Sequence, residues 1–190
     1  MQALIVIDAQ NEFSAKGKRP LVGHDDALKA IEKIVSNFRN AGNPIAWVRH
    51  HNLPHESQAF VSGSWGAEFS PHMGPQPGAQ LEKEFQKNVY GAFTGTNIHE
   101  WLQALGAKTV LIVGFFTHGC VSTTAREAIM AQYDVVLPIE ATASCDINDP
   151  ILGFLAAADC KRAALLQLAN MGATLMTYNA MVLEKSHSRN

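Results

Sequence analysis

The sequence predicts an α/β fold built on a parallel sheet. Short apolar runs alternate along the chain with segments of helical periodicity, the pattern of repeated strand–helix–strand units. Gly42, Gly106 and Gly172 follow the helical segments, as residues that end helices do. Strands are expected near residues 2–8, 44–49, 109–114, 134–138 and 173–177, with a weaker one near 83–87. Helices are expected near residues 25–41, 96–106, 120–132 and 150–171.

Length and charge limit the class of protein. A chain of 190 residues is close to the size of one domain, so residues 1–190 are expected to form a single domain. With 15 basic and 17 acidic side chains, the chain has no basic character that would favour a nucleic-acid partner. No apolar run approaches the ~18 residues of a membrane span, and the N-terminus lacks the features of a signal peptide.

The cysteines indicate a reducing environment. Cys120, Cys145 and Cys160 are odd in number and widely spaced, so they match neither a disulfide framework nor a zinc ribbon. We therefore expect a soluble cytoplasmic protein with no nucleic-acid or membrane partner.

The span from Asn52 to Gln80 departs from the regular alternation. It contains four prolines and the aromatic residues Phe60, Trp65 and Phe69. Loops of this length inside a compact domain are uncommon and are often functional. A disordered linker is the alternative, but aromatic residues are scarce in disordered segments. An ordered lid is therefore expected.

Three chemically reactive side chains are expected to meet at one edge of the sheet. Asp8 ends the first apolar strand, Lys87 lies near the end of the weaker strand, and Cys120 follows the 109–114 strand. Ligands of open parallel sheets bind beyond the carboxyl ends of the strands. There Asp8 can take the thiol proton and return it to a leaving group, with the Lys87 cation beside it. Taken singly, the aspartate is as consistent with a turn cap and the lysine with a solvated surface charge.

Cys120 is expected in the first turn of a helix. The N-terminal end of a helix favours a thiolate and lowers the thiol pKa, and its N–H groups can stabilise an oxyanion. An equally good interpretation of Cys120 alone is a small apolar residue packed beneath the turn. His118 lies only two residues before Cys120 in a tight turn, so we prefer a pocket-lining or turn-capping role for it over that of a general base.

Four stretches of the sequence carry a family resemblance. They are Leu4–Phe13 (LIVIDAQNEF), Lys87–Thr96 (KNVYGAFTGT), Gly114–Val121 (GFFTHGCV) and Thr124–Ala128 (TAREA). In this order they resemble the isochorismatase-like cysteine hydrolases, the superfamily of nicotinamidases, N-carbamoylsarcosine amidases and ureide hydrolases. The resemblance implies a three-layer α/β/α sandwich with a mostly parallel six-stranded sheet, in a homo-oligomer such as a dimer or tetramer.

The resemblance also implies roles for individual residues. Asp8, Lys87 and Cys120 would form a catalytic triad, and the backbone N–H groups of Phe116 and Cys120 an oxyanion hole. The peptide between Phe115 and Phe116 is expected to be cis by the same analogy. Apart from the resemblance, the residues expected to contact substrate are Phe13, Trp65, Tyr90, Phe116 and His118. The four aromatic residues among them are equally consistent with core or oligomer contacts.

Two departures narrow the expected activity. Where nicotinamidases have an Asp-x-His metal site, this chain has His50 and Asn52, so a metal-free enzyme without cofactor is expected. Isochorismatases that cleave a vinyl ether usually lack the cysteine that is present here. The segment Gly63–Phe69 resembles the lid of the metal-free branch, and His118 stands where the family often has aspartate.

The function expected from these features is hydrolysis of a small amide or ureide C–N bond through an acyl-enzyme. One alternative is vinyl-ether cleavage of the isochorismatase type, for which Cys120 would be dispensable. Another is a catalytically silent binding protein on the same fold, which would have no chemical need for all three triad residues. A nucleotide-binding module is disfavoured because no Gly-x-Gly-x-x-Gly follows the first strand.

Overall fold

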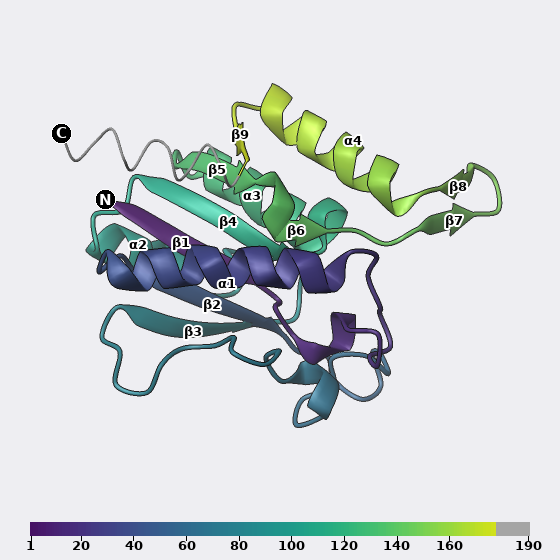
Figure 1. The fold of residues 1–190 in the computed structure, drawn as a ribbon, viewed down its shortest axis with the longest axis horizontal. Coiled ribbons are helices and arrows are strands. Elements are labelled where there is room, and N and C mark those ends of the chain that lie inside the picture. The colour runs from purple at the N-terminus through teal and green to yellow at the C-terminus, as the bar shows by residue number, and fades with distance from the viewer. Residues whose placement is uncertain (178–190) are drawn as a thin grey trace.

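The central sheet places its strands in the order β3-β2-β1-β4-β5-β9, with the short β6 paired to β4 (Figure 1). The computed structural model describes residues 1–177. Every pairing between the described strands of this sheet is parallel. Its strands are β1 Gln2–Ile7, β2 Ile45–His50, β3 Glu82–Lys87, β4 Thr109–Phe115, β5 Asp134–Pro138, β6 Thr142–Ala143 and β9 Thr174–Met176. The α-helices are α1 His24–Asn40, α2 Ile98–Ala104, α3 Ser122–Met130 and α4 Ala157–Asn170.

Alternating side chains of the central strands feed two separate cores. Leu4 and Val6 of β1 pack with Ile31, Ile34 and Phe38 of α1, which repeat at helical spacing along one face of that helix. Their neighbours on β1 point to the other face, where they join apolar residues of α2, α3 and α4. Helices therefore cover both faces of a sheet whose central strands are buried, and the predicted three-layer sandwich is confirmed.

The strand predictions agree with the structure to within one residue at most ends, but one helix prediction is wrong. The helix expected over residues 150–171 begins only at Ala157, and the residues before it form an antiparallel hairpin of β7 Ile147–Asp149 and β8 Gly153–Leu155. Asp149 Oδ1 accepts the backbone N–H groups of Ile151 and Leu152, which stabilises a turn instead of a helix. Gly153 follows with a φ of 83°. Figure 1 shows this hairpin projecting from the body of the molecule.

We predict that Gly114→Ala is strongly destabilising, because the close approach of β4 to β1 needs a residue without a Cβ. The φ of Gly114 is 117°, and a Cβ there would overlap the carbonyl oxygen of Ile7. Backbone strain and overlap together are expected to lower the free energy of unfolding by about 3–5 kcal/mol, measured by urea denaturation.

Gly106→Ala is the matched control for this prediction. Gly106 has a φ of 69°, but nothing lies within 4 Å of the position of its Cβ. Only the conformational penalty of about 1–2 kcal/mol applies there. Equal losses in the two variants would contradict the role assigned to the contact with Ile7.

Candidate active site

The structure brings Asp8, Lys87 and Cys120 together at the carboxyl edge of the sheet. Asp8 directly follows β1, Lys87 is the last residue of β3, and Cys120 lies in a π-helical turn, η3 Thr117–Val121, between β4 and α3. The side chains of Asp8 and Lys87 are almost fully buried, and the Lys87 Nζ lies 2.7 Å from Asp8 Oδ2. A carboxylate oxygen of Asp8 and the Cys120 Sγ lie within 4.8 Å of each other.

The charge of Lys87 is maintained despite its burial. Burial alone lowers the pKa of the ammonium group, but the negative charge of Asp8 and the interaction with Cys120 outweigh burial and raise that pKa overall. The second carboxylate oxygen, Asp8 Oδ1, is buried without a hydrogen-bond partner among the described residues. Asp8 Oδ1 is therefore available to receive a proton, while Oδ2 is bound by the Lys87 ammonium.

The expectation of a lowered thiol pKa at Cys120 is wrong. Burial raises the pKa of this thiol, the charge of Asp8 raises it further, and Lys87 only partly opposes these effects. The first residue of α3 is Ser122, so Cys120 lies before the regular helix, in the turn. The resting thiol consequently keeps its proton, and a thiolate requires transfer of that proton to a nearby base.

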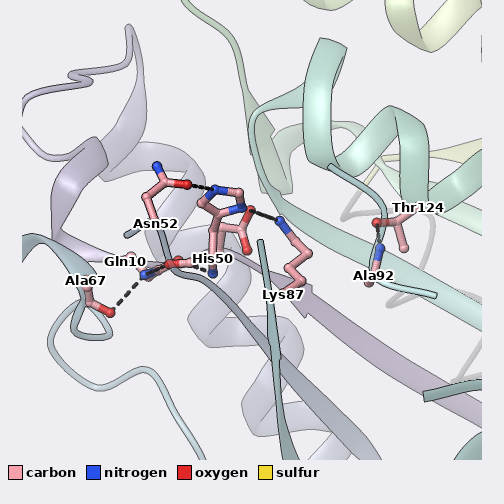
Figure 2. Close-up of polar contacts among 8 residues, drawn as sticks. Gln10, His50, Asn52, Ala67, Lys87, Ala92 and Thr124 are labelled. Carbon is pink, nitrogen blue, oxygen red and sulfur yellow. Dashed lines mark hydrogen bonds and ion pairs between the residues drawn. The ribbon is translucent and has the colours of Figure 1, made fainter. Parts of the chain in front are cut away.

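His50 is a fourth member of this cluster that the sequence analysis did not place there. It ends β2, the strand between β1 and β3, and pairs in register with Lys87. Its Nδ1 lies 3.2 Å from the Lys87 Nζ, and its Nε2 lies 2.8 Å from Asn52 Oδ1. Figure 2 shows His50 between Asn52 and Lys87. The same rule that located Asp8 and Lys87, namely that strand ends meet at the carboxyl edge, would have located His50.

Three residues that follow Asp8 hold the predicted lid segment in place. The Gln10 side-chain amide donates to the backbone carbonyls of His50 and Ala67, at 3.0 and 2.8 Å (Figure 2). The Asn11 side chain donates to the carbonyl of Trp65 at 3.0 Å. The buried Glu12 carboxylate accepts the N–H of Phe60 at 2.9 Å and that of Lys18 at 2.6 Å.

Asp8 and Cys120 line a cavity of about 350 Å³. Of the five residues expected to contact substrate, Phe13, Tyr90 and Phe116 line this cavity, whereas Trp65 and His118 are not among its described lining residues. The sequence analysis missed Arg19, Asn52, Phe60 and Asn88, which also line it. Nothing in the local sequence of Arg19 and Phe60 marks them, because their loops become neighbours only in the fold, through Glu12 and through the bond from Lys18 Nζ to the Gln58 carbonyl.

His118 supports the turn that carries Cys120. Its ring stacks on Phe116 with centroids 4.5 Å apart, and its Nδ1 lies 3.2 Å from the Ser144 Oγ. Burial lowers the pKa of this imidazole. The peptide between Phe115 and Phe116 is cis, as expected. Of the two roles preferred for His118, pocket lining is not met, because His118 is not among the described lining residues; its ring instead contacts Phe116 and Ser144 beside the turn.

Side chains of α3 fix the segment that follows Lys87. The Thr124 hydroxyl accepts the N–H of Ala92 at 3.1 Å (Figure 2). The Glu127 carboxylate accepts the N–H groups of Phe93 and Thr94, at 2.9 and 3.2 Å. The helix that begins after Cys120 thus also positions the chain leaving Lys87.

We predict that Asp8→Asn lowers the pKa of the Cys120 thiol. The substitution removes the charge that opposes ionisation of the thiol and leaves the Lys87 ammonium without its carboxylate, so that the ammonium can stabilise a thiolate. The rate of Cys120 alkylation by iodoacetamide, followed by peptide mass spectrometry, should reach half of its maximum at a lower pH than in the wild type. Cys145 serves as the internal control, and its pH midpoint should not move. A Cys120 midpoint that is unchanged or higher would contradict this electrostatic account.

Comparison with known proteins supports a family assignment. The model of the isochorismatase domain matches residues 2–180. A secreted isochorismatase effector of Verticillium dahliae is 32% identical over 174 residues, which cover 92% of this chain and 86% of that protein. Nicotinamidase 3 of Arabidopsis thaliana is 29% identical over 185 residues, covering 88% and 89% of the two chains. The crystal structure of an isochorismatase from Pseudomonas putida has a TM-score of 0.86 at 31% identity, covering 94% of this chain and 89% of that one. The chain therefore belongs to the isochorismatase family of hydrolases.

Proposed function

We propose that this hydrolase cleaves the C–N bond of a small amide or ureide through an acyl-enzyme on Cys120. The observation that carries the proposal is the convergence of a buried Asp8–Lys87 ion pair with the Cys120 thiol at a cavity. A thiol that keeps its proton at rest needs a base within reach, and the unpartnered oxygen of Asp8 supplies one. The named activity of the Arabidopsis relative, a nicotinamidase, is also cleavage of an amide.

In the first half of the reaction, the Cys120 thiol gives its proton to Asp8 and the Sγ attacks the substrate carbonyl carbon. The electron pair of the carbonyl bond moves to oxygen, where the N–H groups of Phe116 and Cys120 stabilise the negative charge. When the tetrahedral adduct collapses, the C–N bond breaks. The leaving amine or ammonia takes the proton from Asp8, and a thioester to Cys120 remains.

Water completes the cycle. A water molecule attacks the thioester carbon and gives one proton to Asp8, and a second tetrahedral adduct forms at the same oxyanion site. Its collapse breaks the C–S bond, the proton returns from Asp8 to Sγ, and the acid is released. Lys87 remains charged throughout, because its task is to hold Asp8 and to balance the charges that develop beside it.

The cavity indicates a compact substrate. A volume of about 350 Å³ is at the lower end of the usual range for ligand sites, roughly 300–1,000 Å³. Phe13, Phe60 and Phe116 offer aromatic surface, while Arg19 and Asn88 supply polar groups. We propose Phe13, Tyr90 and Phe116 as substrate contacts. His118, which is not among the described lining residues, stacks on Phe116 and would support that contact from behind.

The reaction is proposed to need no metal. Asp8, His50 and Cys120 offer ligand atoms within 4.8 Å of one another, which is a separation that a metal ion could bridge. However, the Lys87 ammonium already binds both Asp8 and His50, at 2.7 and 3.2 Å. A divalent ion at this point would lie beside the buried Lys87 ammonium, and the two positive charges would repel each other. The nearby Asn52 oxygen is also a weak ligand compared with an imidazole.

The protein is further proposed to act as a homo-oligomer in a reducing, cytoplasmic setting. The side chains of Ile151 and Leu152 at the hairpin tip are 90% and 89% exposed, and that of Phe154 is 66% exposed. A two-stranded hairpin is only marginally stable by itself, so a second copy is the proposed cover for this apolar surface. All three cysteines are free. No helix among residues 1–177 is long and apolar enough to cross a membrane.

We predict that a screen of small amides and ureides finds a substrate whose hydrolysis depends on Cys120. Ammonia release should fall by about 10³-fold or more in Cys120→Ala, because the nucleophile is lost. In Asp8→Asn it should fall by about 10²–10⁴-fold, because proton transfer is lost. Cys145→Ala should match the wild type, and exhaustive chelation should leave the rate unchanged. Full activity in Cys120→Ala would favour the vinyl-ether reaction instead, and loss to a chelator with recovery on adding metal would contradict the metal-free mechanism.

The oligomer proposal is tested on the hairpin. Replacing Ile151 and Leu152 together by Asp should reduce the molar mass in light scattering to that of a monomer, because charges would be buried at the contact. Val22→Asp is the control, since that side chain is also exposed, at 66%, but lies outside the hairpin. A wild-type monomer, or an unchanged mass in the double variant, would contradict the proposed contact.

A further inference from the structure

The Lys87 ammonium has more partners than the carboxylate of Asp8. An ammonium group carries three N–H donors. One reaches Asp8 Oδ2 at 2.7 Å, and a second faces His50 Nδ1 at 3.2 Å. The third can face Cys120, whose side chain also interacts with this ammonium. His50 therefore occupies the one donor that neither reacting residue uses.

The tautomer of His50 is determined by Asn52. The Asn52 Nδ2 donates to the carbonyl of Ala59 at 3.0 Å, which fixes the orientation of its amide. Asn52 Oδ1 therefore faces His50 Nε2, at 2.8 Å, and an amide oxygen can only accept a hydrogen bond. The imidazole proton must then lie on Nε2. This leaves a lone pair on Nδ1, directed at Lys87.

The backbone of His50 is held as firmly as its ring. The Gln10 Oε1 accepts the His50 N–H at 2.8 Å, and the Gln10 Nε2 donates to the His50 carbonyl at 3.0 Å. Parallel pairing of β2 with β1 and β3 adds a second constraint on its position. A single rotamer of His50 is thus fixed relative to Asp8 and Lys87.

The charges around His50 favour its neutral form. Burial lowers the pKa of the imidazole most, and the Lys87 charge lowers it further, while Asp8, Asn52 and the Val89 backbone partly oppose these effects. The titratable groups that face His50 are Lys87 on β3, Asp8 after β1, Cys120 in the turn after β4 and the neighbouring His51. Only a neutral imidazole can accept from the ammonium, so geometry and electrostatics agree.

We propose that His50 is a positioning residue for the catalytic lysine. Its neutral imidazole, with the proton fixed on Nε2 by Asn52, accepts a hydrogen bond from Lys87 and so keeps the ammonium between Asp8 and Cys120. The inference rests on the proposed function in one respect: it takes Lys87 to participate in hydrolysis. The hydrogen-bond chain from Ala59 through Asn52 and His50 to Lys87 also links the lid segment to the reacting groups.

The protonation state of His50 can be tested without any substrate. In protein labelled with ¹⁵N at the histidine ring nitrogens, NMR should show His50 neutral and protonated at Nε2 from pH 6 to pH 8. The resonance is assigned by its loss in His50→Gln. In Asn52→Asp, the new carboxylate raises the pKa of His50, so that the ring is protonated on both nitrogens at the acid end of this range. A wild-type ring that is charged at pH 7, or protonated at Nδ1, would overturn the proposal.

The positioning role is tested on the reacting groups. His50→Leu should slow turnover at least about tenfold and move the Cys120 alkylation midpoint to higher pH, because a less constrained ammonium stabilises the thiolate less. His50→Gln should recover part of both effects, because the amide oxygen can accept from Lys87. His51→Leu is the control and should change neither. Thermal melting of each variant separates these effects from loss of fold.

Asn52→Asp gives a pH signature that a merely structural role would not produce. In this variant the pKa of His50 is raised. At any pH below that pKa, Nδ1 carries a proton that faces the Lys87 ammonium. Turnover should therefore fall about tenfold more between pH 8 and pH 6 than it does in the wild type. Wild-type turnover and alkylation in His50→Leu, or an unchanged pH profile in Asn52→Asp, would overturn the proposal. If no amide or ureide is hydrolysed while the NMR and alkylation results hold, the proposed function fails and this inference stands.

Discussion

The buried ion pair between Asp8 and Lys87 is the constraint on which the rest of the site depends. The two residues end β1 and β3, which are separated in the sheet by β2. Adjacent strands lie about 4.8 Å apart, so the ion pair must bridge about 10 Å across β2. The long stem of Lys87, the side chain of Asp8 and the 2.7 Å contact between Nζ and Oδ2 cover this distance together. Removing either partner would leave an uncompensated buried charge, typically destabilising by about 3–5 kcal/mol. The sheet order and the pair therefore support each other.

Much of this arrangement could be predicted from the sequence. The apolar runs predicted the positions of the strands accurately. Central strands of a parallel sheet are buried on both faces, so they consist of consecutive apolar residues. The rule that ligands bind at carboxyl ends then selected Asp8, Lys87 and Cys120 without any coordinates. Residues 150–156 were misjudged as helix, since the composition there does not reveal the turn formed by the Asp149 carboxylate. The role of His50 was obscured because its position was compared only with a metal ligand.

The error in the expected thiol pKa has a physical explanation. A helix N-terminus contributes only about half a unit charge, and its effect fades within one turn. The full charge of Asp8 lies close to Cys120, and burial acts in the same direction. The expectation of a lowered pKa considered only the local helix terminus and left out burial and the Asp8 charge, although Asp8 was itself expected beside Cys120. In the proposed reaction the thiol is therefore activated by proton transfer within the site rather than by a standing anion. A thiol is less readily oxidised than a thiolate.

The residues that immediately follow Asp8 have a consequence for how ligands enter and leave. Gln10, Asn11 and Glu12 tie residues 59–68 to the end of β1, so the cavity wall and the carboxylate move as one body. That wall has little freedom to swing open as an independent flap. Exchange would instead take place between Glu56 and residues 88–90, which line the cavity and are exposed. The rate of product escape would then be governed by the mobility of this narrow rim, while the geometry of the reacting atoms remains undisturbed.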